Sequence, residues 1–283
     1  DVWYVGYAEA LLGSAEAIQA AYHSVDISPF GSAAGYVGPG LALAPARYAQ
    51  LLGFARAPYS VAAPQLQRLP EAVQVAAALE QAALVLNRLA ADVVHLAGDE
   101  RGILRAGADH STGSSIMPQK RNPDAWELLR AESHRLMGYA QDLRQLGLNL
   151  SGGYWRDLQR SKELLFAALD HAADLWQWAT LAVQGLAFDV AACQAALHPS
   201  LFATHQANAL AASGTPFREA YRQAAAAPPT EVPDRPAEAY QYAGAPGQAQ
   251  LTPLRRAWDQ HLAWADQEHA AWQQVVAALR SGA

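Results

Sequence analysis

The spacing of apolar residues is the strongest constraint on this chain, because they recur every third or fourth position over long stretches. That spacing places them on one face of an α-helix. Alanine is abundant, β-branched residues are scarce, and no stretch alternates in the manner of a β-strand. Long helices are predicted over residues 71–95, from Pro123 onward and from Lys162 onward, with others over 3–23, 45–52 and 253–279.

Long helices joined by short loops pack side by side, so the sequence predicts an all-α fold built on a long antiparallel helical bundle. We expect the bundle over residues 1–186 and a small helical domain over residues 187–283. A proline-rich stretch at 226–236 is typical of a linker or a surface excursion. The chain starts with Asp1 rather than Met, inside an apolar helical pattern, so we expect further sequence upstream.

Composition excludes several classes of function. The chain has 283 residues, 52% of them hydrophobic, and can bury a sizeable core. A net charge of −6 without a dense Lys/Arg cluster argues against nucleic acid or a membrane surface as a partner. No apolar run reaches the ~20 residues that cross a bilayer. The lone Cys193 excludes a disulfide framework, and no helix face carries metal-ligand spacing, so we expect a cytoplasmic protein without a metal or cofactor.

The chain has only two lysines, against eighteen arginines. Lys120 lies in the polar segment 113–124, and Lys162 lies in the polar segment 154–162. Where any positive charge is sufficient, this chain uses arginine. A retained lysine therefore suggests a position that needs a compact ammonium group rather than a planar guanidinium, although chance in an arginine-biased composition gives the same count.

Residues 113–124 combine hydroxyl side chains and a glycine with a strong helix start. Asn122 suits the N-cap of the following helix, Pro123 suits its first turn, and Asp124 complements its positive end. Exposed backbone N–H groups at such a helix start, together with Lys120, form a seat for a carboxylate or a phosphate. An ordinary serine-rich loop before a capped helix is the alternative interpretation.

The string Gly-Ser-Ser-x-Met-Pro-x-Lys-x-Asn-Pro at residues 113–123 resembles the signature of the aspartase/fumarase superfamily. Gln119 and Asp124 make it similar to the argininosuccinate lyases in particular. The resemblance implies a β-elimination that releases fumarate from a small succinyl dicarboxylate. It assigns the proton transfer to Ser114, activated by its surroundings and by Lys120, and it assigns substrate binding to Asn122.

A second segment fits the same resemblance. Argininosuccinate lyases carry a Tyr-x-Arg-Asp-Leu-Gln-x-x-Lys pattern at this distance downstream, and residues 154–162 match it. The resemblance assigns substrate contacts to Tyr154, Gln159 and Lys162, with Lys162 pairing with a substrate carboxylate. Packing at a helix start and a solvated side chain are the alternative roles of Tyr154 and Gln159.

The resemblance also implies a homotetramer in which three subunits build each active site, so the long helices are expected to be assembly surfaces. The family's general acid is a histidine in a Thr-x-x-His-x-Gln segment, which these residues do not contain. His110, beside the serine residues, is a weaker candidate for proton transfer.

Four positions depart from the relatives' pattern. Ala62 stands in a region where relatives carry acidic residues, Trp155 stands where asparagine is usual, and Arg160 and Ser161 replace acidic residues.

Three other functions stay open from the sequence. One is another fumarate-releasing lyase, similar to adenylosuccinate lyase or a carboxymuconate cycloisomerase, although Gln119 and the 154–162 segment argue against it. The second is a non-catalytic structural protein on the lyase fold, as lens crystallins of this family illustrate. The third is a plain helical binding module, since fold does not fix function.

Overall fold

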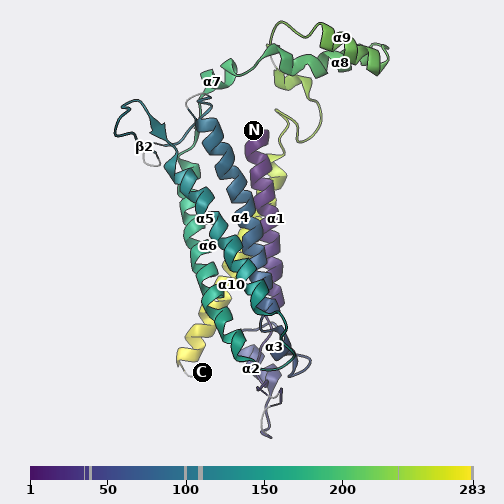
Figure 1. Ribbon diagram of the computed structural model, residues 1–283. Helices are drawn as coiled ribbons and strands as arrows, with labels where there is room; N and C mark the ends of the chain where they lie inside the picture. Colours follow the sequence, from purple (N-terminus) through teal and green to yellow (C-terminus); the bar gives the residue numbers. More distant parts are fainter. Residues whose placement is uncertain (35, 38–39, 99–100, 108–110, 235, 282–283) are drawn as a thin grey trace. The chain divides into compact units, whose positions relative to one another are not determined.

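A computed structural model describes residues 1–34, 36–37, 40–98, 101–107, 111–234 and 236–281 (Figure 1). Contacts divide the chain into two compact units. The bundle unit comprises Tyr7–Ala91, Glu127–Leu181 and Thr252–Ala283. The loop unit comprises Asp1–Gly6, Asp92–Trp126 and Ala182–Leu251. The boundary that the sequence suggested between residues 186 and 187 stays a prediction.

Five long helices dominate the part of the chain that the structure describes. They are α1 (Val2–Val25), α4 (Pro70–Ala97), α5 (Asp124–Leu146), α6 (Ser161–Gln184) and α10 (Leu251–Ser281). Each lies where the apolar spacing predicted a helix, with ends that differ by a few residues. Between them lie the short helices α2 (Pro45–Leu51) and α3 (Ala63–Gln67) and the 3₁₀ turn η2 (Arg156–Arg160). The predicted all-α fold is confirmed.

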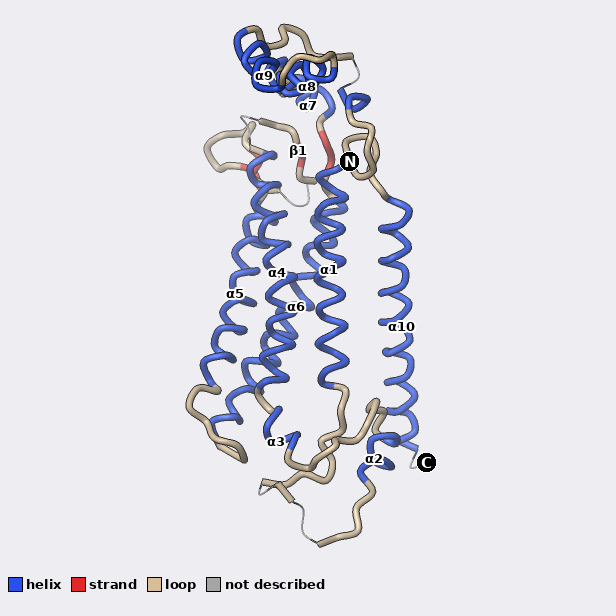
Figure 2. The backbone as a smooth tube through the Cα atoms, turned by 90° about the vertical axis from the view of Figure 1, so that its right-hand side faces the viewer, coloured by secondary structure: helices blue, strands red, loops and turns tan. Residues whose placement is uncertain are grey.

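Within the bundle unit, the parts of α1, α4, α5 and α6 run alongside one another in alternating directions (Figures 1 and 2). Their facing stripes are rich in alanine, which lets the helix axes approach closely. The buried side chains recur at the predicted spacing: Ala76, Leu79, Ala83, Leu86 and Ala90 on α4, Leu129, Leu136, Ala140 and Leu143 on α5, and Ala168, Ala172, Leu175 and Ala179 on α6. Burial of these stripes is the main source of the bundle's stability.

Polar contacts fix the register of helices in the bundle unit. Asn87 Nδ2 donates to the Arg130 carbonyl and to Ser133 Oγ, both at 2.9 Å. Ser133 is fully buried, and its hydroxyl donates onward to the Arg130 carbonyl at 2.8 Å. Because a buried polar group without a partner is costly, this network favours one register of α4 against α5.

The loop unit holds the strands, which are too short for any alternating pattern to reveal in the sequence. β1 (Leu104–Arg105) pairs antiparallel with β4 (Ala187–Phe188), and β2 (Thr112–Gly113) pairs antiparallel with β3 (Arg121–Asn122). No stretch of the sequence alternates in the manner of a β-strand, and two-residue ladders of this kind need no such pattern.

The loop unit also contains α7 (Val190–Ala195), η3 (Pro199–Phe202), α8 (Ala203–Ala212), α9 (Phe217–Ala226) and η4 (Pro236–Ala239). Helices α8 and α9 pack against each other. None of the helices in the described part of the chain is both long and apolar enough to cross a membrane.

Candidate functional site

The serine loop, residues 113–124, is held at its base by the β2–β3 ladder. Thr112 pairs with Asn122, and Gly113 pairs with Arg121, so residues 114–120 form the connection between the two strands. The backbone N–H of Thr112 donates to Asp124 Oδ2 at 2.7 Å, and the Thr112 hydroxyl donates to the same oxygen. These bonds fasten β2 to the first residue of α5.

The hydrogen bonds from Thr112 favour the ionised form of the Asp124 carboxyl group. The hydrogen bond from the Thr112 hydroxyl, aided by backbone N–H groups, lowers the pKa of Asp124 below its usual value of 3.8. Hydrogen-bond donors stabilise an ionised carboxylate and therefore lower its pKa. Asp124 is therefore a carboxylate at neutral pH, and a negative side chain also suits the first turn of a helix.

Ser114 lies at the start of the connection and is half-buried. Its Oγ accepts hydrogen bonds from the backbone N–H groups of Ile116, at 3.2 Å, and Met117, at 3.1 Å. The Lys120 N–H donates to the Met117 carbonyl at 3.1 Å and closes the turn. Two donors aimed at one hydroxyl oxygen stabilise negative charge that develops on it. Sequence reasoning missed these donors, because only the turn geometry aims them at Oγ.

Lys120 and Asn122 occupy half-buried positions in the same loop. The Lys120 ammonium forms no ion pair with the carboxylates that the structure describes. Asn122 was expected to cap the following helix, and this is wrong. Asn122 pairs with Thr112 in the ladder, and α5 begins two residues later at Asp124.

A cavity of about 510 Å³ opens beside Asn122. Its lining includes Ser111, Arg121 and Pro123, and two residues from the β1–β4 side of the loop unit, Arg105 and Asp189. Ser114 and Lys120 are not part of this lining. The structure thus brings Asn122 together with two arginines that sequence reasoning did not select.

The tyrosine segment, residues 154–162, belongs to the bundle unit and includes η2. Leu158 is its buried anchor, with 7% of its surface exposed, and it packs in one cluster with Leu69, Ala72, Ala140 and Leu143. Anchoring η2 through Leu158 leaves the neighbouring polar side chains of the segment at the surface.

Tyr154 and Gln159 contact each other directly, because Gln159 Nε2 donates to the Tyr154 hydroxyl. The Arg68 guanidinium lies 5.1 Å from the centre of the Tyr154 ring, within cation–π range. Lys162 is exposed in the first turn of α6. Of the three predicted substrate residues, Tyr154 and Gln159 are therefore hydrogen-bonded to each other, and Lys162 is a separate exposed side chain on the same segment.

Three of the four departures from the family pattern have local roles. Trp155 Nε1 donates to the Ser151 carbonyl at 2.8 Å, and the Ser161 hydroxyl donates to the Leu158 carbonyl at 2.7 Å. Arg160 lies 3.6 Å from the Glu163 carboxylate in an exposed ion pair. Nothing in the structure explains Ala62.

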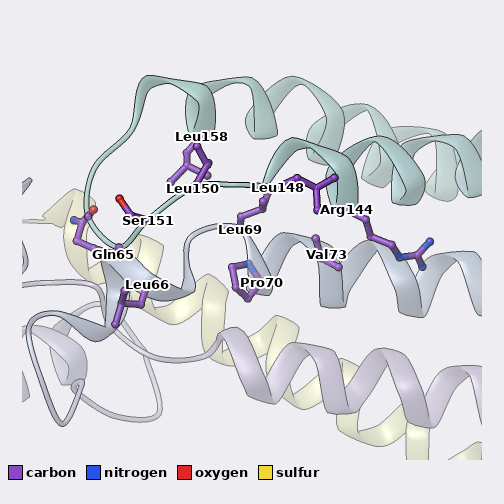
Figure 3. Close-up of a pocket in the computed structure, with 13 residues that line it drawn as sticks. Gln65, Leu66, Leu69, Pro70, Val73, Arg144, Leu148, Leu150, Ser151 and Leu158 are labelled. Carbon is purple, nitrogen blue, oxygen red and sulfur yellow. The ribbon is translucent and has the colours of Figure 1, made fainter.

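A second cavity, of about 420 Å³, lies beside the tyrosine segment in the bundle unit. Figure 3 shows Leu158 and Leu150 on one side of it and Leu66 and Pro70 on the other. The lining is mostly apolar, and it does not include Tyr154, Gln159 or Lys162. This cavity is a product of helix packing around Leu158 rather than a site formed by the predicted substrate residues.

The predicted residues thus form two groups. Ser114, Lys120 and Asn122 share the loop unit, whereas Tyr154, Gln159 and Lys162 share the bundle unit. His110, the weaker candidate for proton transfer, lies outside the described residues. Across the described ranges, no group of three or more His, Cys, Asp or Glu side chains is placed to hold a metal ion.

Comparison with known proteins identifies the family of this chain. The family described as lyase matches residues 2–138. Argininosuccinate lyase from Sorangium cellulosum (strain So ce56) is 38% identical over 266 residues, which are 92% of this chain and 60% of that protein. The chain belongs to the aspartase/fumarase superfamily of lyases.

Other argininosuccinate lyases are similar to this chain to a comparable degree. Argininosuccinate lyase from Xanthomonas campestris pv. campestris (strain B100) is 36% identical over 91% of this chain and 60% of its own length. The corresponding protein from Parabacteroides distasonis is 35% identical over 78% of this chain and 50% of its own length. The chain therefore spans about half to three fifths of the length of these superfamily members.

Solved structures match the fold. An EDDS lyase crystallised with formate aligns with a TM-score of 0.71 and 20% identity, over 98% of this chain and 70% of that one. The class II fumarase from Schistosoma mansoni aligns with a TM-score of 0.60 and 18% identity, over 77% of this chain and 53% of that one. The helical bundle of this chain is thus the superfamily's fold.

Proposed function

We propose that this chain carries part of the active site of a carbon–nitrogen lyase that splits argininosuccinate into arginine and fumarate. The observation that carries the proposal is the serine loop at residues 113–124, within a chain 38% identical to an argininosuccinate lyase over 92% of its length. Because the chain spans 60% of that relative, the complete reaction is proposed for the chain together with the portion it does not cover.

The serine loop supports the proton-transfer step. Eliminating fumarate requires removal of a proton from the carbon beside a carboxylate, which builds negative charge on that carboxylate. In the proposed reaction Ser114 Oγ accepts this proton. The N–H groups of Ile116 and Met117 favour the negatively charged oxygen that can accept it. Lys120 supplies positive charge near the loop, and Asn122 binds the substrate.

The tyrosine segment supports substrate binding. Tyr154 and Gln159 already contact each other, so the pair presents a hydroxyl and an amide at one surface position. Lys162 is exposed and pairs with a substrate carboxylate in the proposed complex. We also propose a homotetramer in which subunits share active sites, in a soluble cytoplasmic enzyme. Sedimentation of the purified chain as a compact monomer would contradict the shared-site arrangement.

Fumarate formation tests the proposal directly. The chain is mixed with the portion of the Sorangium cellulosum relative that it does not cover, and argininosuccinate is added. We expect absorbance from fumarate in the mixture. The same mixture with adenylosuccinate is the specificity control. Faster cleavage of adenylosuccinate would identify it, rather than argininosuccinate, as the substrate.

A matched pair of variants separates catalysis from assembly. Ser114→Ala in the mixture is expected to abolish fumarate formation, whereas Ser115→Ala, the neighbouring serine, keeps most of it. A mixture that assembles, by sedimentation, but forms no fumarate from either substrate would favour the second candidate, a non-catalytic protein on the lyase fold. That candidate has one specific observation behind it, because Trp155, Arg160 and Ser161 depart from the family pattern and have local structural contacts.

A further inference from the structure

A third cavity, of about 440 Å³, lies in the bundle unit and is lined by residues of α1, α4 and α6 together with Arg68. Its volume lies within the roughly 300–1,000 Å³ range of small-ligand sites. None of the residues assigned to proton transfer or to substrate binding in the proposed elimination lines it. The cavity is therefore a feature of the bundle for which the lyase proposal gives no use.

Apolar side chains make up most of the lining. Its most deeply buried members are alanines, Ala21 from α1 and Ala72 and Ala78 from α4, with no more than 7% of their surface exposed. Their small side chains leave the space that larger residues would fill. Leu169 of α6 also lines the cavity and is 43% exposed, so the cavity opens to solvent there. Such walls favour a ligand that buries an apolar part.

Glu71 is the acidic residue of the lining. It is half-buried in the first turn of α4, and its carboxylate has no ion pair with the residues that the structure describes. Burial raises its pKa above the usual 4.5, because a carboxylate removed from water without a partner is destabilised. The residues of the bundle unit outside the described ranges are glycine, proline and alanine, so none of them supplies a charged side chain.

The other two titratable residues of the lining are engaged elsewhere. Arg68 forms no ion pair with Glu71, and its guanidinium lies 5.1 Å from the centre of the Tyr154 ring, which is outside the lining. The Tyr22 hydroxyl donates to Glu268 Oε2 at 2.9 Å. Burial and this carboxylate raise the pKa of Tyr22 to about 12, so Tyr22 is neutral at ordinary pH. Glu71 is thus the lining residue that still lacks a partner of opposite charge.

We propose that this cavity binds a small organic ammonium ion that carries an apolar chain. The ammonium group pairs with the Glu71 carboxylate, and the chain lies against the buried alanines and Leu169. Charge complementarity selects a cation, because a partner for a desolvated carboxylate offsets the cost of its burial. The proposal does not rest on the lyase reaction, and fumarate formation does not enter its test.

The test is a titration of the purified chain, followed by calorimetry and by NMR of methyl groups. The probes are hexylamine, hexanol and hexanoate, which share a six-carbon chain and differ in the head group. We expect hexylamine to bind at least about tenfold more tightly than hexanol, which is about 1.4 kcal/mol, and hexanoate to bind most weakly. Hexylamine should shift the methyl resonances of Ile18 and Leu169, which line the cavity. Equal affinities for hexylamine and hexanol would overturn the proposal.

The preference for hexylamine should also depend on pH. Protonation of Glu71 removes the charge that attracts the ammonium group, so the preference should shrink as pH falls through the raised pKa of Glu71. Hexylamine stays protonated throughout this range, and hexanol has no charge to lose. A preference that does not change in acid would contradict the assignment to Glu71.

Matched variants make the result specific. Glu71→Gln is expected to weaken hexylamine binding at least about tenfold and to leave hexanol binding unchanged. Glu16→Gln removes the same charge from an exposed position on α1 and should leave both unchanged. If Glu71→Gln does not fold, Leu169→Trp narrows the open side of the cavity and should weaken both ligands, whereas Leu181→Trp, on the exposed face of the same helix, should not.

Three further outcomes would overturn the proposal. They are no hexylamine binding up to about 10 mM, equal weakening by the Glu71 and Glu16 variants, and unchanged binding in the folded Leu169 variant. A second copy of the chain is the other possible occupant of an apolar cavity. In that case dilution of the chain would shift the Ile18 and Leu169 resonances and hexylamine would not, which would identify an interface between copies in place of a ligand site.

Discussion

The serine loop and the tyrosine segment hold their polar side chains by different means. In the serine loop, backbone N–H groups from neighbouring residues are directed at Ser114, and a two-residue ladder closes the base. In the tyrosine segment, one buried leucine anchors a 3₁₀ turn against the bundle, and Tyr154 and Gln159 are carried on its surface. The serine loop is thus organised by local hydrogen bonds, and the tyrosine segment is organised by long-range packing.

Because the two segments are held in different ways, they should respond differently to substitution. Hydrogen bonds exposed to solvent contribute little stability each, so substitutions in the serine loop should change chemistry more than folding. A buried apolar anchor contributes several times more, so its loss should change folding first.

Ser114→Ala should give the largest effect, and it should fall on activity. Removing the proposed proton acceptor is expected to lower fumarate formation by about 100-fold or more, because positioned acid–base groups contribute that much. The midpoint of thermal unfolding should stay close to that of the unmodified chain. A large loss of stability in this variant would mean that the loop, like the tyrosine segment, depends on packing.

Leu158→Ala should lower the stability of the fold, in contrast to Ser114→Ala, which should lower activity. The side chain is buried to all but 7%, so its truncation is expected to lower the free energy of unfolding by about 2–4 kcal/mol. Leu181→Ala is the matched control, because Leu181 lies on α6 with 54% of its surface exposed, and it should cost less than about 1 kcal/mol. Urea unfolding measures both. Equal losses would show that Leu158 is not the anchor.

Lys162→Arg tests why a lysine is retained in the tyrosine segment. The charge is kept, but the compact ammonium is replaced by a larger planar group, so we expect KM for the succinyl substrate to rise about threefold to tenfold. Arg160→Lys, two residues earlier and exposed, should leave KM unchanged. An unchanged KM in the Lys162 variant would remove the reason for assigning the lysine to a substrate carboxylate.

Thr112→Val should give the smallest effect and a dependence on pH. The variant removes the hydroxyl donor that lowers the pKa of Asp124, so that pKa should rise towards 3.8. A depressed carboxylate pKa stabilises the fold above the unfolded-state pKa, and this contribution is lost as pH falls through the folded-state pKa.

The variant should therefore cost no more than about 1 kcal/mol at neutral pH, given the solvent exposure of this contact. The difference should disappear as pH falls below 3.8. Chemical unfolding at several pH values measures it. The matched control is Thr230→Val, an exposed threonine of the loop unit. A difference that persists in acid would mean that Asp124 is not the partner through which Thr112 acts.

Much of the fold followed from the sequence, because helix formation depends on neighbours three and four positions apart. The apolar stripe of α4 and the helix start near Pro123 are local patterns of this kind. The capping role of Asn122 could not be predicted correctly, since Thr112, ten residues away, pairs with Asn122 in a ladder. A two-residue ladder leaves no periodic signal in the sequence.

The sequence predicted which residues belong to the candidate site, but it did not predict how the fold arranges them. The strings at 113–123 and 154–162 named Ser114, Lys120, Asn122, Tyr154, Gln159 and Lys162, and their catalytic and binding roles stay predictions. No string indicated that Arg105 pairs with Asp189, which lies 84 residues away. Because this ion pair joins residues so far apart in the sequence, only the fold could reveal it.

The helices, the superfamily motifs and the two polar segments depend on side chains near one another along the chain, so they could be predicted without the fold. Which polar groups are already hydrogen-bonded or ion-paired depends on residues that folding brings together from distant parts of the chain. Leu158 becomes an anchor through contacts with Leu69 and Ala72, far from it in sequence. Arg105 and Arg121 are chemically the same, but within the described residues the fold brings a carboxylate only to Arg105.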